Sequence, residues 1–260
     1  MQHRQRGAAA LVLLAMMMVV MGVALMSAIN HNTPQYYTRD VRNTQALAIA
    51  KSALLGYFIS HKAFPCPDVD NQGQAASNSG GSCSPNVNQA GLYIGRLPWK
   101  TLGLEALQDG QYECLWYIIS PDYLADLSAQ YPSIVAASVA STPFAEQLRV
   151  RAVGDNDTTP NSIAAVVAVG SAYPDQTRRT DIQAPQCQAS SPTPLTSSDL
   201  PHFFEQFNSH ILTVSTETSR QAPASDAQHN NDQASVIAFS EVRSLVKKAY
   251  CKENPSASGC

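Results

Sequence analysis

The chain has 260 residues, of which 44% are hydrophobic and 14% charged, and its formal net charge is −3. Nucleic-acid-binding proteins need an excess of lysine and arginine to neutralise phosphates, so this balance argues against a nucleic-acid partner. About 200 residues follow the amino-terminal region, which is enough for one domain with its own hydrophobic core.

The first thirty residues combine a short basic stretch with a long apolar run. Arg4 and Arg6 precede an almost wholly apolar run from Ala8 to Ile29. A helix of about 20 apolar residues is long enough to cross a bilayer, and the basic flank predicts that the amino end stays in the cytoplasm. The run is longer than the apolar part of a secretory signal and ends without a good cleavage site. We therefore expect a membrane span that the mature protein keeps.

The segment after Pro34 has the pattern of an amphipathic helix, from about Arg39 to Ser60. Its apolar residues recur at three- and four-residue spacing, which places them on one face of a helix. They are Leu47, Ala50, Leu54, Tyr57 and Phe58. Together with the apolar run, this pattern predicts one long helix over residues 8–62.

The remaining residues, 63–260, are predicted to form a globular head that is mostly sheet. The apolar runs Glu113–Ile119 and Ile163–Val169 indicate central strands that are covered on both faces. Leu148–Val153 alternates as a half-buried strand does, and Ile211–Thr216 is a fourth candidate. Short helices are expected from Asp199 and near the carboxyl end. The paired cations Arg178–Arg179 and Lys247–Lys248 are interpreted as solvated surface.

All six cysteines lie beyond the predicted membrane span. An even number on the exported side indicates disulfides formed in an oxidising compartment, although six cysteines allow 15 pairings. We expect Cys66 with Cys83, which closes a polar loop, and Cys251 with Cys260, which ties down the tail. This leaves Cys114 with Cys187. Zinc is the alternative, but no cysteine and histidine cluster at ligand spacing is present.

Candidate ligand and catalytic residues are few. The stretch DVDNQG places Asp68 and Asp70 at alternate positions and Gly73 at the sixth, as at the start of a calcium-binding loop. The glutamate expected at the twelfth position is Ser79, so an Asx-rich turn is the alternative. No cofactor other than this calcium candidate is expected. No nucleophile elbow, zinc-protease motif or P-loop occurs, so we predict a protein that is not an enzyme.

A basic leader that ends at Gly7 and runs directly into an apolar helix resembles the leader of type IV pilins and type II secretion pseudopilins. Three further stretches are similar, in sequence and in their order along the chain, to motifs of pseudopilin-like proteins of these systems. They are FPCPDVDNQG, GRLPWKTLGL and ECLWYIIS. The resemblance implies that a prepilin peptidase cuts between Gly7 and Ala8 and that Ala8 is then methylated. It also implies a pilin-like α+β fold, in which a long N-terminal transmembrane and amphipathic helix packs on a mainly antiparallel β-sheet head.

Val12 departs from the pattern of that family. The major subunits carry glutamate at this fifth mature position, where it is thought to pair with the terminal amine of a neighbour. Minor subunits at filament tips tend to lack it. The resemblance therefore implies a non-enzymatic minor subunit, placed at the tip, that takes part in assembling a type IV pilus or a type II secretion filament.

Three parts are predicted: a leader over residues 1–7, a membrane-spanning and amphipathic helix over 8–62, and a disulfide-bonded periplasmic head over 63–260. This organisation predicts a single-pass protein of the bacterial inner membrane that also enters a periplasmic or cell-surface filament. The expected partners are other pilin or pseudopilin subunits, the prepilin peptidase and the inner membrane. The alternative is a membrane-anchored periplasmic domain that binds or hydrolyses a ligand.

Overall fold

The structure is a computed structural model that describes residues 14–22, 33–137, 148–155, 159–174, 176–178, 187–189, 194–208, 210–215, 230–257 and 259–260. The chain divides into two compact units, Met1–Arg42 and Asn43–Cys260. In the first unit a short helix covers residues 14–22. Helix α2 (Thr33–His61) begins in the first unit and continues into the second, which contains all the strands.

The predicted fold class is wrong. The expected single long helix over residues 8–62 is not seen among the described residues, which show a short helix at 14–22 and helix α2 from Thr33 to His61, with residues 23–32 outside the described part. The second unit is mostly sheet, and the sheet is mixed, because β6 (Leu148–Ala152) runs parallel to β9 (Ile211–Val214). Apolar periodicity predicts where helical segments lie, but it carries no information about the strand order or the parallel pair of the sheet.

The predicted inner-membrane anchoring is not supported either. Within the described part of the chain, every helix is too short or too polar to cross a membrane. The run that suggested a span is described only at residues 14–22, and the rest of it lies outside the described residues. What the structure does support is an oxidising environment, because it contains three disulfides.

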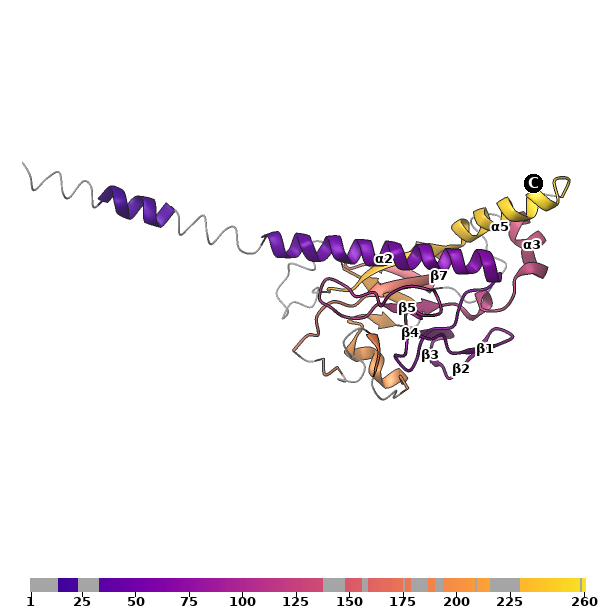
Figure 1. The fold of residues 1–260 in the computed structure, drawn as a ribbon, viewed down its shortest axis with the longest axis horizontal. Coiled ribbons are helices and arrows are strands. Elements are labelled where there is room, and N and C mark those ends of the chain that lie inside the picture. Colours follow the sequence, from indigo (N-terminus) through magenta and orange to yellow (C-terminus); the bar gives the residue numbers. More distant parts are fainter. Residues whose placement is uncertain are drawn as a thin grey trace, which may run out of the picture. The chain divides into compact units, whose positions relative to one another are not determined.

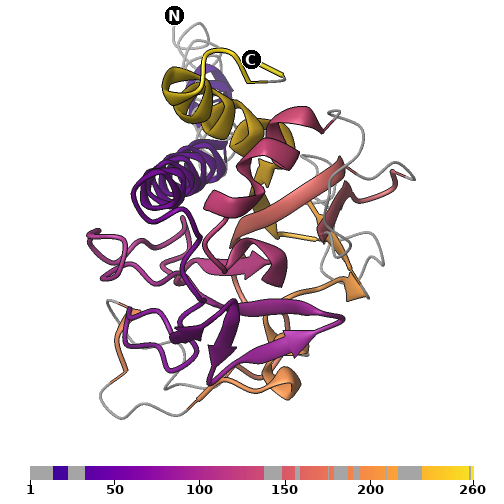
Figure 2. The same ribbon diagram turned by 90° about the vertical axis from the view of Figure 1, so that its right-hand side faces the viewer.

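An eight-stranded sheet forms the centre of the second unit and curls on itself (Figures 1 and 2). Seven of its strands lie in the order β3–β4–β5–β7–β6–β9–β8. The eighth, β10, pairs with β7 in addition to the neighbours that this order gives β7. Apart from the β6–β9 pair, the neighbours are antiparallel. The other strands are β3 (Val87–Gln89), β4 (Leu92–Arg96), β5 (Trp116–Ile119), β7 (Thr159–Ala168), β8 (Phe207–Asn208) and β10 (Gln233–Ala238). Strands β1 (Ser77–Ser79) and β2 (Ser82–Ser84) form a separate two-stranded sheet.

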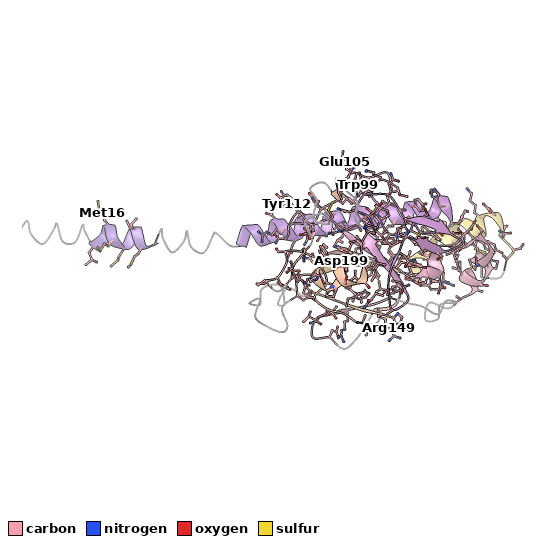
Figure 3. All side chains as sticks on the ribbon, turned by 90° about the horizontal axis from the view of Figure 1, so that it is seen from below. Met16, Trp99, Glu105, Tyr112, Arg149 and Asp199 are labelled. Atoms are coloured by element: carbon pink, nitrogen blue, oxygen red, sulfur yellow. A yellow bond between two sulfur atoms is a disulfide. The ribbon has the colours of Figure 1, made fainter. Side chains whose placement is uncertain are left out.

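Strands β5 and β7 confirm the two central strands predicted from apolar runs. In β5, Trp116 and Ile118 belong to one core cluster, whereas Tyr117 and Ile119 belong to the other. Because side chains alternate along a strand, this division shows that both faces of the sheet are covered. Strand β6 confirms the half-buried pattern, since Leu148 and Val150 are buried and Arg149 is exposed at the edge of the head (Figure 3).

Helices cover one face of the sheet, and an irregular segment covers the other. On the first face lie the Asn43–His61 part of α2, helix α3 (Tyr131–Ala136) and helix α5 (Phe239–Glu253). On the second face lie Leu195 to Phe204, including the 3-10 helix η4 (Ser197–His202). Two further 3-10 turns, η1 (Pro121–Tyr123) and η2 (Ser128–Gln130), precede α3.

The buried side of α2 confirms the amphipathic pattern expected between residues 39 and 60. Leu47, Ala50, Leu54 and Phe58 are buried in the core cluster that α2 shares with the sheet. Tyr57, which the same pattern assigned to this face, is only half-buried. The tertiary contacts therefore select a narrower buried stripe than the sequence indicated.

Three disulfides join Cys66 to Cys83, Cys114 to Cys187 and Cys251 to Cys260, with Cα–Cα distances of 5.8, 5.6 and 5.4 Å. All three predicted pairings are confirmed. The bond between Cys114 and Cys187 closes the longest loop, since its cysteines are 73 positions apart. It ties the entry of β5 to the short described segment 187–189.

Candidate functional site

The side of α2 that faces away from the sheet forms an exposed surface of the second unit. Between residues 43 and 61 we call the following exposed residues the outer face: Thr44, Gln45, Ala48, Ile49, Ser52, Gly56, Ile59 and Ser60. Two of them are large and apolar, because Ile49 is 48% exposed and Ile59 is 56% exposed. An amphipathic helix normally turns charged side chains to water, whereas the 43–61 part of α2 has none on its outer face.

Small residues form a continuous row along the outer face. Ala48, Ser52, Gly56 and Ser60 are four residues apart, so they lie above one another on the same side of the helix. A Cβ atom added at Gly56 would meet nothing within 4 Å. Packing inside the chain therefore does not require a glycine there. A row of small side chains lets the axis of a second helix approach closely.

The outer face carries no formal charge. Lys51 is the only lysine, arginine, aspartate or glutamate between residues 43 and 61. Its ammonium group turns toward the protein, where it pairs with Glu241 at 2.7 Å and donates a hydrogen bond to the carbonyl oxygen of Val236 at 2.7 Å. An uncharged face with exposed isoleucines is costly to leave in water and suited to contact with another apolar helix.

The predicted calcium loop has the geometry of a turn that satisfies its own carboxylate. Asp68 is 1% exposed, and its two carboxylate oxygens accept hydrogen bonds from the backbone N–H groups of Asp70, Gln72 and Gly73. The carboxylate of Asp70 likewise accepts the N–H of Gln72 at 3.2 Å. These contacts fit the Asx-rich turn, which was the alternative interpretation. Calcium binding by Asp68 and Asp70 stays a prediction.

Replacing Asp68 by alanine tests the role of this turn. We expect a loss of about 2 kcal/mol or more in the free energy of unfolding, because three backbone N–H groups lose their acceptor in a buried place. The loss should be the same in EDTA and in calcium, measured by urea denaturation. The exposed Glu253→Ala is the control and should change stability by about 0.5 kcal/mol or less. A loss that appears only in calcium would instead support the calcium loop.

Two arginines are buried against aromatic residues on the second face of the sheet. The guanidinium of Arg96 lies 4.3 Å from the ring centre of Trp116 and 4.8 Å from that of Phe203. Arg178 lies 5.0 Å from the same Phe203 ring and pairs with Glu113 at 3.1 Å. Contacts of this kind are favourable when the cation is desolvated. Burial lowers the pKa of Arg96 to about 10, which still leaves it charged at neutral pH.

Arg178 corrects the interpretation of the Arg178–Arg179 pair as solvated surface. Its side chain is only 1% exposed, and it donates hydrogen bonds to the carbonyl oxygens of Val169, Gly170 and His202. Arg179 lies outside the described residues. The sequence of two adjacent cations does not show which of them is buried. Only the structure shows that Arg178 is buried and paired with Glu113.

Gly7 and Ala8, where leader cleavage and methylation were predicted, lie outside the described residues. In the part of the chain that is described, no three or more histidine, cysteine, aspartate or glutamate side chains gather in a way that would hold a metal. The chain matches no protein-family model, no curated protein and no solved structure.

Proposed function

We propose that this protein is a non-enzymatic minor subunit of a pilin-like assembly, either a type IV pilus or a type II secretion filament. The observation that carries the proposal is the outer face of α2, which is uncharged and lined by a row of small residues. The amino-terminal sequence supports it, because Gly7 stands between a basic leader and an apolar run, as in prepilins. Val12 supports a place at the tip, since bulk subunits carry glutamate there.

The outer face suits contact with a helix of another subunit. Ala48, Ser52, Gly56 and Ser60 carry only small side chains along this side of α2, and Ile49 and Ile59 are exposed on the same outer face. A second helix that packs on this row would remove both isoleucines from water without burying a charge. The expected partners are therefore other pilin or pseudopilin subunits that offer an apolar helix. The prepilin peptidase is the expected processing partner at Gly7.

Replacing Gly56 by leucine separates assembly from folding. The added side chain points into open space, and leucine has a higher helix propensity than glycine, so the variant should be more stable by about 0.5–1 kcal/mol. The same side chain would hold a partner helix away from the row of small residues. In a strain that lacks the native gene, we therefore expect the variant to restore less than about a tenth of the filaments or secreted protein that the native chain restores, a deficit of about 1.4 kcal/mol or more in association.

The matched control is Ala249→Leu, which adds a leucine at an exposed position of the other long helix, α5. It should complement fully. Sheared filaments and culture supernatant are quantified by immunoblotting, and the free energy of unfolding of each purified variant is measured by urea denaturation. Full complementation by Gly56→Leu, or normal assembly and secretion in the deletion strain, contradicts the proposed function.

A further inference from the structure

A pocket of about 250 Å³ opens on the second face of the sheet. It lies where the two ends of the curled sheet come together, because Gln89 of β3 and Phe207 of β8 both line it. Residues of η4 and the segment that follows it form the rest of the wall. Pockets for drug-sized ligands have volumes of about 300–1,000 Å³, so this one suits a ligand with a single small ring.

Apolar side chains form the floor of the pocket. Leu200 and Phe204 are buried, and Phe207 is half-buried beside them. The ring of Phe204 packs between two others, since its centre lies 5.2 Å from that of Trp116 and 5.9 Å from that of Phe207. Rings packed against one another keep a fixed orientation, so this apolar surface is formed before any ligand arrives.

Uncharged polar side chains form the rim of the pocket. Gln89, Ser197 and Gln206 line it. Within the described chain no hydrogen bond uses their side-chain groups, and these groups are not closed off from solvent. The neighbouring Ser198 differs, because its hydroxyl is hydrogen-bonded to that of Thr196 at 2.8 Å. Two carboxamides and one hydroxyl therefore offer both donors and acceptors to a ligand.

The pocket offers no charged group to a ligand. Glu205 contributes to the wall, but its carboxyl oxygens are covered, and they are hydrogen-bonded to the side chain of Asp232 and to the backbone N–H of Asn231. The other described residues that line the pocket are uncharged. An ion that left water for such a site would lose its solvation without gaining a counter-charge, so the pocket favours a neutral ligand.

We propose that this pocket binds one pyranose ring of a neutral saccharide. A pyranose presents a face of C–H groups, which packs on apolar side chains, and a periphery of hydroxyls, each of which can donate and accept a hydrogen bond. The apolar floor matches the face, and the rim of two glutamines and a serine matches the hydroxyls. A wholly apolar ligand would instead leave the rim groups desolvated and without partners.

Sugar binding does not depend on the assembly function proposed above. The pocket lies on the second face of the sheet, whereas α2 covers the first. Binding is therefore measured on the purified full chain, and its failure would leave the proposed role of the outer face untouched.

Saturation-transfer NMR tests the proposal with four sugars, D-glucose, D-galactose, D-mannose and N-acetyl-D-glucosamine. We expect at least one of them to bind with a Kd of about 1 mM, a strength suited to a small open site. Glycerol has hydroxyls but no ring, so it should give no signal. Gln89→Ala and Gln206→Ala should each weaken binding of that sugar about 3–10-fold, because each removes one hydrogen-bonding group from the rim.

Ser197→Phe is the decisive variant, because the added ring occupies the pocket. It should weaken binding more than about tenfold, whereas Ser198→Phe, the same change at the next exposed residue, should bind as the native chain does. Urea denaturation checks that both variants fold. The inference is overturned if none of the four sugars binds, if glycerol gives an equal signal, or if Ser197→Phe keeps the native Kd. If Ser197→Phe does not fold, an unchanged Kd in both alanine variants overturns it instead.

Discussion

Replacing Arg178 by alanine should lower the free energy of unfolding by about 3–5 kcal/mol, the loss typical of breaking a buried ion pair from one side. The guanidinium pairs with Glu113 at 3.1 Å, and the two side chains are 1% and 13% exposed. Its removal leaves the carboxylate of Glu113 in a poorly solvated place. It also removes the donor that the carbonyl oxygens of Gly170 and His202 share.

The measurement is urea denaturation in EDTA, so that bound calcium does not contribute. Arg149→Ala is the matched control, because Arg149 is exposed on β6, and its loss should change stability by about 0.5 kcal/mol or less. The double variant Arg178→Met with Glu113→Met should recover part of the loss, since it also removes the carboxylate that the single variant leaves without Arg178. A loss below about 1 kcal/mol for Arg178→Ala would show that the buried pair does not support the fold.

Removing the disulfide between Cys114 and Cys187 should cost more than removing either of the other two. In the loop-entropy description, a bond that spans 73 positions contributes about 4 kcal/mol, whereas the Cys251–Cys260 bond, which spans 9, contributes about 2.5 kcal/mol. The long bond also holds segment 187–189 against the turn at Asn71, where the N–H of Ala189 donates to the Asn71 carbonyl oxygen at 2.9 Å.

This prediction is tested with double alanine variants, Cys114→Ala with Cys187→Ala and Cys251→Ala with Cys260→Ala, which leave no free thiol to exchange. Urea denaturation of the two variants and the native chain under non-reducing conditions gives the two losses. The variant without Cys251 and Cys260 is the internal control, because it also lacks one disulfide. Equal losses, or a larger loss from the tail bond, would contradict the loop-entropy explanation for this chain.

The sequence alone determined the features that depend on residues near one another in the chain. The apolar runs at β5 and β7, the alternation in β6 and the buried stripe of α2 follow from short periodicities, which local backbone geometry imposes. The cysteine pairings were also predictable, because two of the three bonds close short loops and the last pair is then the one remaining.

Only the tertiary structure decided where the charges lie. Glu205 and Asp232 are 27 positions apart and meet because η4 and the start of β10 reach the same end of the sheet. Arg178 is buried because the carbonyl oxygens of three distant residues and Glu113 converge on it. A charged residue has the same sequence signature whether water or protein groups solvate it, since its burial depends on contacts that no local pattern records.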